Sequence, residues 1–189
     1  RTVSGPTFGY QRRADRYRVV TGFRAWSKQE DVALGPDYDL GLTVSLPEFG
    51  GDVDRILFDG TLSTALEAGP WLLVGNSWFE GRLDQGDMHN WVVGFQGVAT
   101  QLGPRGLQAR LMVESSYELD PERQLALGAD TGLRGWDPDY FDGTGRAVAN
   151  LQWRHLIKED ILHLFSLGFV VFADAGTTWG ARVGPGADR

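Results

Sequence analysis

The 189-residue chain contains no cysteine and only three histidines, which are His89, His155 and His163. The lack of cysteine excludes disulfide bonds, Cys–Zn sites and thiol catalysis within this sequence. The histidines share no metal-ligand spacing, so we expect no metal site. The formal net charge of -7 argues against a nucleic-acid partner, because phosphate binding needs clustered Lys and Arg.

Long hydrophobic runs are also missing. No run approaches the roughly 18 apolar residues of a membrane helix, and no charged-then-apolar signal segment follows Arg1. The low mean hydropathy does not decide the membrane question, because a membrane β-barrel alternates apolar and polar residues along each strand. The 26 glycines and 12% aromatic residues suit tightly turned strands with aromatic rings at an interface.

The dominant hydrophobic period is two. Residues 107–119 are the cleanest case, with one face formed by Leu107, Leu111 and Val113 and the other by Gln108, Arg110 and Glu114. The same alternation runs through residues 39–46, 56–68, 71–83 and 91–99, whereas helical spacing is not sustained over a comparable length. Turn signals separate these segments at hairpin spacing, at 67–70, 85–87, 102–106 and 120–122. The sequence predicts an all-β chain with antiparallel, up-and-down connections.

Two architectures fit this pattern. In a soluble sandwich the apolar face is the core, and in a membrane barrel it meets lipid. The segments run about 9 to 13 residues, which exceeds the usual 5 to 6 of soluble strands and matches the 9–11 of a spanning strand. The polar face mixes charges of both signs, as in a wet interior, and includes Arg24, Glu80, Arg82, Arg110, Glu114 and Arg154. Aromatic residues near segment ends, such as Trp26 and Tyr117, fit an interfacial girdle.

Residues 128–145 read GADTGLRGWDPDYFDGTG and form a long, glycine-rich connection. Its aspartates lack the spacing of a helix–loop–helix calcium site, so we interpret them as a solvated acidic loop. Its single arginine, Arg134, is framed by Leu133 and the Gly135–Trp136 pair. An ordinary exposed loop arginine is one explanation of Arg134, and a specific partner elsewhere in the chain is the other.

Three short motifs stand in order near the end of the chain: LRGW at 133–136, NLQWR at 150–154 and FADAG at 172–176. Together they make the chain resemble the BamA/TamA family of bacterial outer-membrane barrels, also called the bacterial surface antigen family. The resemblance is specific over residues 124–180 and generic before them. The family commonly has a glutamate where this chain has Gln152, which would leave its arginine one carboxylate instead of two.

The resemblance implies that loop 128–145 is extracellular and folds into the barrel lumen, where Arg134 would meet Asp174 with Gln152 beside them. The alternation places the two partners of Arg134, Asp174 and Gln152, on the polar faces of their strands. An arginine fork can bind a carboxylate through two hydrogen bonds and an amide oxygen through a third. We predict a structural latch formed by Arg134, Gly135, Trp136, Gln152, Asp174 and Gly176, supported in the lumen by Asn150, Arg154 and Phe172.

The resemblance also implies a fold and a location. We expect residues 1–189 to be part of a transmembrane β-barrel in the bacterial outer membrane, about nine or ten strands of a larger, 16-stranded barrel. Further closing strands would follow the loop-like tail at 184–189, and periplasmic repeat domains would precede Arg1. The turn near residues 158–160 would be periplasmic.

The implied function is insertion of unfolded client proteins into the outer membrane, or translocation of secreted ones, in contact with lipids and accessory subunits and without a cofactor. A barrel that serves as membrane anchor or export pore for an attached passenger is the alternative, and a soluble β-sandwich binding module is a more distant one. We do not expect an enzyme, because the Gly-x-Ser-x-Gly elbow and phosphate-binding glycine loops are missing and no motif ties a serine to His163.

Overall fold

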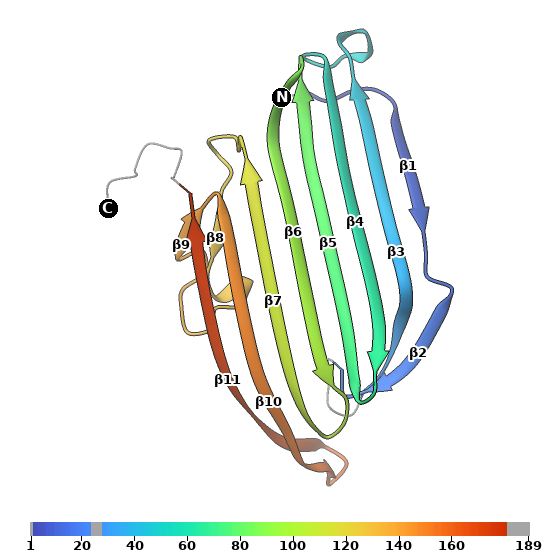
Figure 1. Cartoon of the computed structure of the whole chain (residues 1–189), viewed down its shortest axis with the longest axis vertical. Coiled ribbons are helices and arrows are strands. Elements are labelled where there is room, and N and C mark those ends of the chain that lie inside the picture. The colour runs from blue at the N-terminus through green and yellow to red at the C-terminus, as the bar shows by residue number, and fades with distance from the viewer. Residues whose placement is uncertain (1, 24–27, 181–189) are drawn as a thin grey trace.

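The computed structural model describes residues 2–23 and 28–180 (Figure 1). The positions Arg24 and Trp26, and the tail at 184–189, lie outside the described residues. Within these ranges, no helix is long and apolar enough to cross a membrane.

Nine of the strands in the described ranges form one antiparallel sheet, in which most strands pair with their neighbours in the sequence. They are β1 (Thr7–Arg12), β2 (Arg16–Thr21), β3 (Gln29–Ser45), β4 (Arg55–Ala68), β5 (Trp71–Asp84), β6 (Asp87–Gln101), β7 (Arg105–Tyr117), β10 (Gly145–Ile161) and β11 (Phe165–Trp179). β1 and β2 follow one another along the same edge of β3. The predicted all-β, up-and-down arrangement is confirmed, although the described strands do not close into a barrel.

Three short elements interrupt the meander between β7 and β10. β8 (Leu125–Leu127) pairs with β9 (Phe141–Gly143) in a separate two-stranded sheet, and the 3-10 turn η2 (Ala129–Thr131) lies between them. A second 3-10 turn, η1 (Pro47–Phe49), lies between β3 and β4. Residues 120–122, predicted as a hairpin turn, therefore lie near the start of a long connection that spans 118–144.

Most of the long strands exceed the predicted 9 to 13 residues, and β3 and β10 have 17 each, whereas β7 has 13 and matches the prediction. β3 pairs with β2 up to Leu34 and with β4 from Gly35 onward, and the φ of 105° at Gly35 departs from regular strand geometry. Residues 158–160 were predicted as a turn, and this was wrong: they lie in β10, and the reversal falls at 162–164.

The two faces of the sheet differ in what they expose. We call the face that carries Arg110, Asn150 and Asp174 the inner face and the opposite one the outer face. Exposed large apolar side chains recur across the outer face, among them Phe8, Leu40, Leu62, Phe79, Phe95, Leu111, Leu151, Trp153 and Phe169. Buried polar side chains belong to the inner face, and they are Ser45, Arg55, Arg82, Thr100, Glu114 and Arg154.

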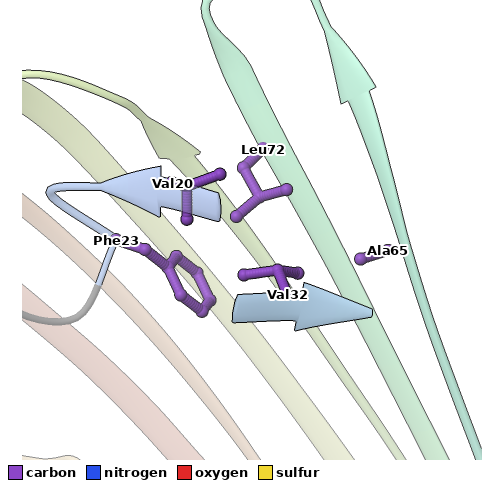
Figure 2. Packing of buried hydrophobic residues seen from close by; sticks show 5 residues of the cluster. All are labelled: Val20, Phe23, Val32, Ala65 and Leu72. Atoms are coloured by element: carbon purple, nitrogen blue, oxygen red, sulfur yellow. The ribbon is translucent and has the colours of Figure 1, made fainter. Parts of the chain in front are cut away.

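The sequence predicts a polar inner face, but the inner face is not polar throughout. A buried apolar cluster lies at the end of the sheet where β2 leads into β3 (Figure 2), formed by Val20, Phe23, Val32, Ala65 and Leu72. Arg154 of β10 donates hydrogen bonds of 2.9 Å to the carbonyls of both Gly22 and Phe23. The end of β2 is thus folded over the inner face, where Val20 and Phe23 are buried.

Candidate functional site

The 118–144 connection lies against the inner face because its own leucines are buried there. Leu127 is fully buried and Leu133 is 6% exposed. They pack with two inner-face residues, Met112 of β7 and Val148 of β10, and the cluster is bordered by Trp78 and Phe141. Burial of a leucine is worth about 1.5–3 kcal/mol, so these contacts contribute to holding the connection on the sheet.

Two arginines of the sheet bind the first part of the connection, one through an ion pair and one through a backbone carbonyl. At its start, Asp120 accepts two hydrogen bonds of 2.7 Å from the Arg82 guanidinium and a third from Asn90. Further along, at β8, the carbonyl of Ala126 accepts a hydrogen bond from Arg146 of β10, which also donates to Glu114 of β7 at 2.7 Å. The bidentate geometry at Arg82 is the stronger form of an arginine–carboxylate contact.

Arg134 reaches Asp174 of β11 from the middle of this connection. Its Nε and Nη2 donate to the two carboxylate oxygens at 2.7 and 2.6 Å, and its backbone N–H donates at 3.2 Å. Asn150 of β10, directly paired with Asp174 in the sheet, donates a further bond at 2.7 Å. The Asp174 side chain is only 4% exposed, whereas that of Arg134 is 34% exposed.

The Arg134 guanidinium has two further contacts. Its carbon lies 3.8 Å from the ring centroid of Phe172, in the range of a cation–π interaction. Its Nη1 donates to Gln152 Oε1 at 3.1 Å. The hydrogen bonds to Asp174 raise the pKa of Arg134, so the arginine stays charged.

Gln152 extends the contact across the sheet. Its amide donates to Gln108 Oε1 of β7 at 2.6 Å, and the Gln108 amide donates to Thr100 Oγ1 of β6 at 2.8 Å. The amide orientations follow from this hydrogen-bond pattern. A chain of polar contacts therefore links the loop arginine to three strands beyond its ion pair.

Glycines make room for the loop at three points. Gly135 has a φ of 88°, which allows the turn after Arg134. A Cβ at Gly176 would lie 3.0 Å from Leu127 Cδ2, so this glycine leaves space for the buried leucine. A Cβ at Gly132 would lie 2.6 Å from Arg110 Nη1, and the φ of 111° there also favours glycine.

Most of the predicted residues meet in one place. The structure brings together Arg134, Gln152, Asp174, Asn150 and Phe172, with Gly135 and Gly176 beside them. Trp136 lies outside this contact, because after the Gly135 turn its ring packs on Tyr140 and Phe141, with each pair of centroids 4.9 Å apart. Arg154 is also outside it, at the Gly22 and Phe23 carbonyls.

Sequence reasoning missed the part that Arg110 takes in the site. Its guanidinium donates to Asn150 Oδ1 at 2.9 Å and to the Thr131 carbonyl at 3.0 Å, which ties β7 to both β10 and the loop. The alternation of β7 places Arg110 on the inner face, but only the register of β7 against β10 sets it opposite Asn150.

The arrangement is built for holding a loop in place. Across residues 2–23 and 28–180, no group of three or more His, Asp or Glu side chains could hold a metal ion.

Comparison of the chain with protein-family models, with curated proteins and with solved structures finds no match in any of the three.

Proposed function

We propose that this chain is part of an outer-membrane β-barrel of the BamA/TamA type, which inserts or translocates unfolded client proteins. The observation that carries the proposal is the distribution of side chains on the sheet: large apolar residues are exposed on the outer face, and charged residues are buried on the inner one. A soluble sheet has the reverse distribution, because its apolar face is the core.

Lipid accounts for the outer face. Monomeric soluble proteins rarely expose contiguous apolar patches beyond a few hundred Å², and here the exposed apolar residues extend from Phe8 of β1 to Phe169 of β11. A sandwich would need a second sheet to cover them. Among the described residues the other sheet is the three-residue pair β8–β9, and it lies on the inner face. Strands of 13 residues or more are also long enough to span a membrane.

The latch would stabilise the barrel into which clients are inserted. Arg134 ties the loop to Asp174 of β11, and Asn150 of β10 donates to the same carboxylate, so the loop is joined to two neighbouring strands. An unfolded client strand can pair with the edge of a sheet, and we propose that it does so at the seam of the closed barrel. Client insertion then needs no nucleotide, because burial of the client's apolar face in lipid supplies the free energy.

Reconstitution tests the proposal. The intact protein in lipid vesicles should accelerate folding of a urea-unfolded eight-stranded outer-membrane barrel, followed by heat-dependent gel mobility, relative to empty vesicles. Asp174→Ala should lose part of this acceleration, and the matched control Thr61→Ala, on the inner face away from the loop, should keep it. An intact protein that enters vesicles but leaves client folding at the empty-vesicle rate would contradict an insertion function and favour the passenger anchor.

A further inference from the structure

A hollow of about 150 Å³ lies beside the latch on the inner face. Five of the six lining residues have polar side chains, although most of the surface that faces the hollow is carbon; two are arginines and none is acidic: Gln108, Arg110, Gly132, Arg134, Asn150 and Gln152. Pockets for drug-sized ligands are about two to seven times larger, at about 300–1,000 Å³. The size of the hollow therefore suits a few waters or a small ion better than a drug-sized ligand.

The positive charges at the hollow are not fully balanced. Arg134 is paired with Asp174, which lies behind it and does not line the hollow. Arg110 donates only to neutral groups among the described residues: Gln96 Oε1 at 2.8 Å, the Thr131 carbonyl, Asn150 Oδ1 and the sulfur of Met112 at 3.4 Å. The nearby carboxylate of Glu114 is itself paired with Arg146. A partly buried cation without a counter-charge is unfavourable, and a bound anion would relieve that cost.

We propose that this hollow binds a small inorganic anion, held between the guanidinium groups of Arg110 and Arg134. Both groups have donor capacity to spare. Of the five N–H groups of a guanidinium, Arg134 uses its Nε and one on each Nη, and the Nη2 of Arg110 has only the weak sulfur acceptor. Gly132 keeps the space open, since any side chain there would collide with Arg110.

An anion at this point would join three parts of the molecule. Arg110 belongs to β7, the amides of Asn150 and Gln152 belong to β10, and Arg134 belongs to the loop. Binding would thus fasten the loop to the sheet in addition to the Asp174 pair. The proposal concerns this hollow alone and holds whether or not the protein inserts clients.

Thermal unfolding of the intact protein in a non-ionic detergent tests the site, with sodium chloride, sodium phosphate and sodium gluconate compared at equal ionic strength. A ligand that binds only the native state raises stability with its concentration above Kd. Chloride or phosphate should therefore raise the unfolding midpoint with a saturable dependence, while gluconate, which is too large for the hollow, should not. The more effective of the two identifies a halide or an oxyanion as the occupant.

Three variants make the test specific. Gln152→Glu places a carboxylate at the hollow and should abolish the anion dependence, and Arg110→Gln should weaken or abolish it. The control Arg105→Gln removes an exposed arginine from the same strand and should retain it. Equal midpoints of the unsubstituted protein in all three salts would overturn the proposal. A full anion response in Gln152→Glu would also overturn it. So would a loss of the response in Arg105→Gln, because that loss would indicate general screening. If Arg110→Gln does not fold, Gln152→Glu decides the matter.

Discussion

Removal of either partner of the Arg134–Asp174 pair should destabilise the protein, and the two losses should not add. Asp174 is 4% exposed and receives four hydrogen bonds, of which Arg134 supplies three. Arg134→Ala removes the two from the guanidinium and leaves a buried carboxylate with Asn150 and one backbone N–H. Asp174→Ala leaves an arginine that is already 34% exposed and can turn to water.

The burial of each partner sets the expected magnitudes. Breaking a fully buried pair costs roughly 3–5 kcal/mol, and the partial exposure of Arg134 places Arg134→Ala at the low end, about 3 kcal/mol. Asp174→Ala should cost less, about 2 kcal/mol, because the orphaned group is the solvated one. The double variant should cost no more than about 3 kcal/mol, which gives a coupling energy of about 2 kcal/mol between the two side chains.

Denaturant titration of the intact protein, refolded in detergent and followed by heat-dependent gel mobility, measures these free energies of unfolding. Trp136→Ala is a matched control in the same loop, and its loss should stay below about 1 kcal/mol because its ring does not contact the pair. A cycle in which the two single losses add, with a coupling energy near zero, would refute the reasoning.

Three further predictions concern the fork, the outer face and the sidedness of the loops. Arg134→Lys should recover less than half of the stability lost in Arg134→Ala, because a point charge cannot bind both carboxylate oxygens and Gln152 together; the same titration measures it. Leu111→Arg on the outer face should reduce membrane assembly, at a cost of about 2–4 kcal/mol if the site lies near the midplane. Thr61→Arg on the inner face should cost less than about 1 kcal/mol. Equal yields of the two folded variants in membranes would count against the assignment of faces. On whole cells, a cysteine at Tyr140 should react with a membrane-impermeant reagent and one at His163 should not, and strong labelling at His163 would reverse the orientation.

The strands could be predicted from the sequence because a period of two depends on each strand alone. Leu111 and Arg110 fall on opposite faces, as the alternation of 107–119 requires. The pairing of Arg134 with Asp174 came from a motif resemblance, and its geometry is present in the structure. What the alternation could not supply was the partner of any charged residue on a distant strand.

Contacts between side chains of distant strands could not be predicted from the sequence, for a physical reason. Arg82 meets Asp120 only because the 118–144 connection turns back over the inner face, and Arg110 meets Asn150 only because of the register between β7 and β10. The reversal at 162–164 was missed because its Leu-His-Leu sequence has no glycine or proline, yet Leu162 and His163 adopt positive φ values of 56° and 57°. Such turns are set by the strands on either side.

The central claim is that the outer face of this sheet meets lipid. The cysteine-free chain allows single cysteines to be placed and spin-labelled at each position from 107 to 115 on β7, in the intact protein in vesicles. We predict that accessibility to membrane-dissolved oxygen will alternate with a period of two, high at Leu107, Ala109, Leu111 and Val113. The even positions between them should be either more accessible to a water-soluble nickel complex or inaccessible to both reagents. Uniform accessibility along β7, or high nickel-complex accessibility at Leu111 and Val113, would contradict the claim.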